Sequence, residues 1–248
     1  MHARLLGAMT IIGGLLLLAA HGAFAQADLA LVMAVDVSSS VNDERFQLQR
    51  DGIAQSLQSR AVLDAMVGGP HQTIELAIIE WSEEQSVLLD WTIVRGSADL
   101  DRVVRTLRTT LRPKVGWKTD IGGGIAKAIA LLDSAPLAAS RRIIDVSGDG
   151  QQNCGHTAAD QARGAALAKG ITINGLPITS GDDPEVDRWY EQHVIGGEGA
   201  FMIVANGHER FADAMRKKLA LEIAGVMATS RLAAAHESDA TPKPPDVR

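Results

Sequence analysis

The stretch Leu29-Ala30-Leu31-Val32-Met33-Ala34-Val35-Asp36-Val37-Ser38-Ser39-Ser40 joins an almost unbroken apolar run to a polar one. Such an apolar run is typical of a central parallel strand that is covered on both faces of its sheet. The polar residues have the form Asp-x-Ser-x-Ser, which puts oxygen donors at alternating positions. Hard oxygen donors suit a small cation such as Mg²⁺ better than Zn²⁺. We therefore predict a strand over Leu29 to Val35 with a metal site at its carboxyl end.

Downstream of this strand, segments with strand and helix periodicity alternate along the chain. Helices are expected over about 42–66, 100–111, 125–132, 157–169, 184–194 and 211–227, and strands over 74–81, 87–94, 141–146, 171–178 and 200–205. The strands 74–81 and 87–94 are close enough in sequence to form a hairpin, which places one of them at an edge. This alternation predicts an α/β fold, namely a doubly wound, mostly parallel, Rossmann-like sheet with helices on both faces and one antiparallel edge strand.

The two ends of the chain differ from this pattern. Residues 1–25 carry Arg4, an apolar stretch and then Ala23-Phe24-Ala25, which are the three regions of a secretory signal peptide, so cleavage is expected after Ala25. An uncleaved membrane anchor is the alternative, because the apolar run is near the short end for spanning a bilayer. Residues 229–248 are rich in proline and are expected to form a disordered tail. The domain itself is expected over 28–228, in a periplasmic or secreted protein.

Charge and cysteine content narrow the classes of function. The chain has 24 Lys and Arg against 30 Asp and Glu, a net charge of -6, and loss of Arg4 with the signal makes it -7. An acidic chain disfavours nucleic acid as a partner. Cys154 is the single cysteine, so it has no internal disulfide partner and is expected to be a free, partly buried thiol.

Three segments can meet at the carboxyl edge of such a sheet, where open α/β folds bind their ligands. The first carries Asp36, Ser38 and Ser40, the second is a loop that ends at Thr119, and the third is the end of a later strand with Asp149. Together they form an all-oxygen set with few charges, which leaves a magnesium ion open to a carboxylate from outside. We predict that these residues hold one divalent cation.

These three motifs make the chain resemble the von Willebrand factor A-type, or integrin I-like, domains. The metal-ion-dependent adhesion site (MIDAS) of that family combines Asp-x-Ser-x-Ser with a later Thr and a later Asp, which match Thr119 and Asp149 here. The segments Asp145 to Gly150 and Val194 to Phe201 further resemble an uncharacterised exported bacterial branch of the family.

The resemblance implies a function as well as a fold. It implies Mg²⁺ or Mn²⁺, with Ca²⁺ as an alternative, held directly or through water by Ser38, Ser40 and Thr119 and balanced by Asp36 and Asp149. A Glu or Asp of a protein partner would complete the metal's shell. The cation would then bridge two proteins, and the domain would be a protein-binding module rather than an enzyme.

The alternative function is a magnesium-dependent phosphoryl-transfer hydrolase with Asp36 as nucleophile. Such enzymes generally need a second Asp two positions further on as acid and base, and Ser38 stands at that position. Nucleotide binding is rejected, because no phosphate-loop lysine follows the glycines at 122–124.

Several other polar residues have two interpretations. Asp120 caps the next helix or supports the metal, and the cap is favoured. Asp145 is expected to be a buried carboxylate that supports the site, and Trp117 either rims the binding face or is half buried. The histidines lack metal-ligand spacing and are expected on the surface or in loops.

Overall fold

The computed structural model describes residues 26–179 and 183–225, so the predicted signal 1–25 and the predicted tail 229–248 lie outside the described residues. Its centre is a six-stranded sheet with the strand order β4-β3-β2-β6-β7-β8. The strands are β2 (Leu29–Asp36), β3 (Ile74–Trp81), β4 (Gln85–Val94), β6 (Arg142–Gly148), β7 (Thr172–Thr179) and β8 (Ala205–Asn206). Neighbouring strands are parallel, except for the antiparallel hairpin of β3 and the edge strand β4. The predicted fold class is confirmed.

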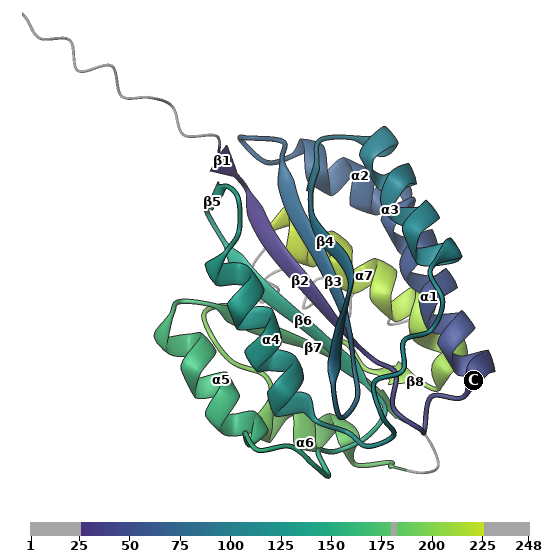
Figure 1. Cartoon of the computed structure of the whole chain (residues 1–248). Helices are drawn as coiled ribbons and strands as arrows, with labels where there is room; N and C mark the ends of the chain where they lie inside the picture. Colours follow the sequence, from purple (N-terminus) through teal and green to yellow (C-terminus); the bar gives the residue numbers. More distant parts are fainter. Residues whose placement is uncertain (1–25, 180–182, 226–248) are drawn as a thin grey trace, which may run out of the picture.

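Helices cover both faces of this sheet (Figure 1). One face carries α1 (Asp43–Leu57), α2 (Arg60–Val67), α3 (Ser97–Thr109) and α7 (Phe211–Ala224), which follows the short 3-10 helix η1 (His208–Arg210). The other face carries α4 (Ile121–Asp133), α5 (Ala159–Ala168) and α6 (Val186–His193). Within the described ranges, no helix combines the length and the apolar character needed to cross a membrane.

The strand β2 is the centre of both cores. All eight of its residues are buried, as the unbroken apolar run predicts. Leu31 and Met33 belong to the core under α1, α3 and α7, whereas Val32 and Ala34 belong to the core under α4, α5 and α6. Successive side chains of a strand point to opposite faces, so an apolar residue is needed at every position.

Two of the predicted elements are wrong. The helix expected over about 42–66 is two helices, because Gln58 ends α1 and the extended Ser59 caps α2, its hydroxyl accepting from the Val62 N–H. The strand expected over 200–205 is reduced to Ala205–Asn206, and Met202 makes only an isolated bridge to Gly175. Both differences lie outside the four strands that form the middle of the sheet.

Both ends of the described domain lie at the amino edge of the sheet. The short strands β1 (Gln26–Ala27) and β5 (Ala138–Ala139) pair in parallel, and the Ser140 N–H donates to the Ala27 carbonyl oxygen at 2.9 Å. The neighbouring Arg141 donates to the carbonyl oxygens of Glu222 and Ile223 at the end of α7. The opposite, carboxyl edge is where the strand order reverses between β2 and β6, the position at which open α/β sheets form a crevice.

Candidate metal centre

Asp36 is the last residue of β2, and the loop that follows folds back over its carboxylate. The Ser38 N–H donates to Asp36 Oδ1 at 2.7 Å, and the Gln49 side chain of α1 donates to the Asp36 carbonyl oxygen at 3.3 Å. Asp36 is fully buried, and its Oδ2 has no hydrogen-bond partner among the described residues. A buried carboxylate oxygen without a partner is costly, so a bound cation would stabilise this position.

Ser38, Ser40 and Asp149 are joined side chain to side chain. Ser38 Oγ lies 3.1 Å from Ser40 Oγ, and Ser40 Oγ donates to Asp149 Oδ1 at 2.5 Å. Asp149 follows β6 and is only 2% exposed. The structure therefore brings four of the five predicted residues, Asp36 included, into one cluster at the carboxyl ends of β2 and β6.

Thr119 lies between the loops that follow β2 and β6, and it is buried. Two residues before it, the Trp117 carbonyl oxygen accepts from the Ser39 N–H at 2.9 Å. On the other side, the Thr119 N–H donates to Asn153 Oδ1 at 2.9 Å. These bonds fix the Thr119 segment against both parts of the cluster, and the role of its hydroxyl as a ligand stays a prediction.

The electrostatics of this cluster favour a cation. Burial and then the neighbouring Asp149 carboxylate raise the pKa of Asp36 from 3.8 to about 7. Two buried carboxylates that repel each other, together with two hydroxyls, form a donor set that fits a hard divalent ion. Within the described ranges, no group of three or more His, Cys, Asp or Glu side chains is arranged to hold a metal ion. The candidate centre consists instead of two carboxylates and hydroxyl groups.

Sequence reasoning missed two side chains beside Asp149. Arg45, in the first turn of α1, donates to the Ser40 carbonyl oxygen at 2.7 Å and lies 3.5 Å from Asp149 Oδ2. His208 Nε2 lies 3.6 Å from the same carboxylate oxygen. His208 is buried, which corrects its expected surface or loop position, and burial lowers the pKa of its imidazole while Asp149 acts in the opposite direction. No spacing in the sequence indicates either contact, because the pairs are far apart along the chain.

The other polar residues near this edge have clear positions. Asp120 caps α4 by accepting from the Gly123 N–H at 2.9 Å, as favoured from the sequence. Cys154 is a partly buried free thiol, and burial raises its pKa. The Trp117 side chain is 75% exposed, which decides against the half-buried alternative.

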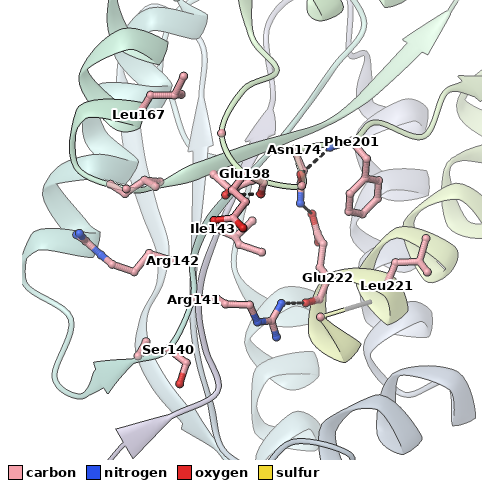
Figure 2. A pocket seen from close by; sticks show the side chains of 17 residues that line it. Ser140, Arg141, Arg142, Ile143, Leu167, Asn174, Glu198, Phe201, Leu221 and Glu222 are labelled. Carbon is pink, nitrogen blue, oxygen red and sulfur yellow. Dashed lines mark hydrogen bonds between the residues drawn. The ribbon is translucent and has the colours of Figure 1, made fainter. Parts of the chain in front are cut away.

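A second cluster of buried charges lies deeper along β6, and two of its members, Asn174 and Glu222, are drawn in Figure 2. Asp145 is buried as predicted, but its partner is Lys218 of α7, whose Nζ lies 2.6 Å from Asp145 Oδ1 and also contacts Glu222. The Asn174 amide of β7 donates to Glu222 Oε1 at 2.8 Å. Burial and the Asp145 carboxylate raise the pKa of Glu222 to about 7, against the opposing effect of Lys218.

A cavity of about 570 Å³ opens beside this second cluster, between the end of α7 and the loops around β6 and β7. Its lining includes Glu222, Asn174, Phe201 and Arg141, as Figure 2 shows. None of its lining residues belongs to the candidate metal centre. This cavity and the cluster of carboxylates and hydroxyls at Asp36 are thus separate features.

The fold is that of the von Willebrand factor A-type proteins, to which solved structures of low sequence identity are similar. Solved structures share this fold. Proximal thread matrix protein 1 from the mussel byssus, with a zinc-occupied MIDAS motif, matches with a TM-score of 0.57 and 15% identity over 81% of this chain and 49% of that one. The von Willebrand factor type A protein from Catenulispora acidiphila matches with a TM-score of 0.57 and 16% identity over 79% and 43%.

A pilus adhesin, SpaC from Lactobacillus rhamnosus GG, matches with a TM-score of 0.58 and 14% identity over 79% of this chain and 30% of that chain. The chain thus spans less than half the length of these three proteins. The family model "Protein of unknown function (DUF1194)" matches residues 26–227, and the chain belongs to this family. A comparison with curated proteins finds no match.

Proposed function

We propose that this protein is an exported, divalent-cation-dependent protein-binding module of the adhesion type. Asp36, Ser38, Ser40, Thr119 and Asp149 hold Mg²⁺ or Mn²⁺, with Ca²⁺ as an alternative, and an Asp or Glu of a protein partner completes the shell. The observation that carries the proposal is the buried, unpartnered Asp36 Oδ2 in a cluster of hydroxyls and a second carboxylate. The MIDAS motif of one structural neighbour holds zinc and another neighbour is an adhesin, which supports the same function.

The proposal extends to the organisation of the chain. Residues 1–25 serve as a cleaved signal peptide, 28–228 form the binding domain and 229–248 form a tail. The mature protein is periplasmic or secreted, and its acidic charge disfavours nucleic acid as the partner. Contact with a membrane would require that the signal is not cleaved.

The phosphoryl-transfer alternative gains no support from the geometry. A nucleophilic carboxylate must reach a substrate, whereas Asp36 is fully buried and its Oδ1 accepts from the Ser38 N–H. The structure also places Ser38, which carries no acid or base for turnover, against Ser40. We therefore propose that the domain is not an enzyme.

Metal-linked stability tests the proposed centre. The melting temperature of the purified protein is measured in chelator and then with Mg²⁺, Mn²⁺, Ca²⁺ or Zn²⁺ added. Binding to the folded state alone stabilises it by about 2.7 kcal/mol when the free metal is 100 times its Kd. The melting temperature of the native protein is expected to rise when metal is added. Asp36→Asn and Asp149→Asn are expected to lose this rise.

The matched control is Asp160→Asn, which removes an exposed carboxylate of α5. This variant is expected to keep the full response to metal. A native protein whose melting temperature does not change with any of the four ions would contradict the proposed metal centre.

A further inference from the structure

Trp117 is an exposed aromatic residue at the rim of the candidate metal centre. Its side chain is 75% exposed, and it is the only aromatic among the large apolar side chains that the described residues expose. Its own carbonyl oxygen accepts from the Ser39 N–H, between the candidate ligands Ser38 and Ser40. Tryptophan is enriched at the energetic centres of protein interfaces.

Hydrogen bonds hold the backbone around Trp117 in place, whereas the Trp117 side chain is exposed to solvent. The Trp117 N–H donates to Glu83 Oε2 at 2.9 Å. Gly116 has a φ of 94°, a left-handed conformation that favours glycine and turns the chain toward Glu83. Val115 is buried in a small apolar cluster with Val37, Val41 and Phe46. A backbone fixed in this way loses little entropy when a partner binds, so the position of Trp117 is pre-organised for contact.

The same part of the chain is basic. Between Asp101 and Asp120 the sequence contains six Lys and Arg residues and no Asp or Glu, although the whole chain has a net charge of -6. Lys114 and Lys118, on either side of Trp117, are exposed. Glu83 offsets part of this charge, because its Oε1 lies 3.9 Å from Lys118 Nζ. The remaining positive charge attracts an acidic partner and speeds its association.

We propose that the metal centre and Trp117 form one binding surface for an acidic segment of a protein. The inference rests on the proposed function and adds the chemistry of the partner to it. The segment places one carboxylate at the cation and an apolar or aromatic side chain, a few residues away, against the Trp117 indole. Lys114 and Lys118 face the remaining acidic residues of the segment.

A protein segment fits this surface better than nucleic acid or lipid. The Trp117 main-chain carbonyl oxygen is hydrogen-bonded to the Ser39 N–H, which places the residue beside the cluster proposed to take a cation and, through it, a carboxylate. A polyphosphate chain or an anionic bilayer would also be attracted by Lys114 and Lys118. These two occupants are therefore outcomes of the test.

The test selects binders of the purified protein from a random peptide library displayed on phage, once in Mg²⁺ and once in EDTA. Peptides that bind only in Mg²⁺ are expected to contain Asp or Glu with an aromatic or aliphatic residue nearby. Their affinity is then compared between the native protein and Trp117→Ser, with Val67→Ser as the control because Val67 is 60% exposed on α2. Trp117→Ser is expected to weaken binding by about 10-fold or more, and Val67→Ser is expected to leave it unchanged.

The affinity for Mn²⁺ alone, followed by electron paramagnetic resonance, separates this inference from the proposed function. Trp117→Ser is expected to bind Mn²⁺ like the native protein. The double variant Lys114→Gln, Lys118→Gln is expected to lose about threefold in peptide affinity at low salt and less at high salt. Lys217→Gln, an exposed change on α7, is its control.

Metal-dependent peptides that Trp117→Ser binds as tightly as the native protein would overturn the inference and leave the proposed function standing. A selection without any metal-dependent peptide would overturn both. Binding of a single-stranded oligonucleotide or of phosphatidylglycerol vesicles in EDTA, lost in the same variants, would assign the surface to another class of partner and also overturn the inference.

Discussion

Asp145 and Asp149 are both buried, at the middle of β6 and just after its end, yet the fold treats them differently. Asp145 is 2.6 Å from the ammonium group of Lys218, which is itself fully buried. Among the residues that the structure describes, the Arg or Lys nearest to Asp149 is Arg45, at 3.5 Å and with 29% of its side chain exposed. The comparison indicates that a buried carboxylate has a structural role when it pairs with a buried cation of the same chain, as Asp145 does with Lys218. A carboxylate whose internal cation is more distant and partly exposed, such as Asp149, can take a further cation from solution.

The largest expected effect comes from removing the internal cation. Lys218→Met leaves Asp145 and Glu222 buried without a counter-charge, and breaking a buried pair in this way costs about 3–5 kcal/mol. Urea unfolding measures the loss in free energy of unfolding. Lys217→Met, which removes an exposed neighbour on the same helix, is expected to change stability by less than about 0.5 kcal/mol. Equal losses in the two variants would show that Lys218 does not stabilise the fold by pairing with Asp145 and Glu222.

The next effect is that of Asp149→Asn, measured in the same way with and without metal. In chelator the variant is expected to stay within about 1 kcal/mol of the native protein, because the lost hydrogen bond from Ser40 is offset by less repulsion of Asp36. In Mg²⁺ at 100 times its Kd it is expected to lack about 2.7 kcal/mol of metal-linked stabilisation. A large loss in chelator would show that Asp149 is structural, like Asp145.

The pH dependence of stability distinguishes the two clusters by a smaller effect. Because the pKa of Asp36 is raised from 3.8 to about 7, its contribution to stability is present at acid pH and is lost as the pH rises through about 7. In chelator, the native protein is expected to lose about 2 kcal/mol more than Asp36→Asn between about pH 5 and about pH 8. Magnesium binds the ionised form of the Asp36 carboxylate, so it is expected to remove this difference in pH dependence between the native protein and Asp36→Asn.

Glu222 has a pKa raised to about 7 as well, so its share of the pH dependence has the same sign. The comparison of native protein with Glu222→Gln is expected to give a similar slope that magnesium does not alter. If magnesium abolished both shares of the pH dependence, the two clusters would be coupled rather than separate.

The smallest expected effect concerns Arg45. Its guanidinium lies near Asp149 but is partly exposed, so solvent screens its attraction to the carboxylate. Arg45→Met is therefore expected to raise the affinity for Mn²⁺ by only about threefold, since one competing positive charge is lost. Titration of Mn²⁺ measures this change, and Arg60→Met, which is distant in sequence and 87% exposed, is the control. A fall in affinity would mean that Arg45 positions the ligands instead.

The sequence predicted those parts of this molecule that have short-range signals. The apolar run of β2 and the hairpin of β3 and β4 were predictable from alternation and length. The cluster of Asp36, Ser38 and Ser40 could be placed because a parallel sheet brings its carboxyl ends to one edge. The break at Ser59 was missed because the apolar period continues across it, and only the cap marks the second helix.

Long-range partners were not predictable. Lys217 and Lys218 are neighbours of the same type, and only the packing of α7 decides that one is exposed and the other is fully buried. The same holds for Arg45 and His208, which reach Asp149 from opposite ends of the chain. Asp145 was expected to support the metal site because it precedes Asp149. In the structure its carboxylate forms an ion pair with Lys218 of α7 instead.

Both ends of the described domain lie at the amino edge of the sheet. This arrangement determines how far the Asp36 cluster lies from a point at which either end is attached. The chain enters near Ala27 and leaves beyond Ile223, both of which bond to the segment of Ser140 and Arg141. The eight residues of β2 separate this edge from Asp36, a height of roughly 26 Å at about 3.3 Å per residue. A tether fixed at either end would hold the Asp36 cluster on the far side, facing outward to an approaching molecule.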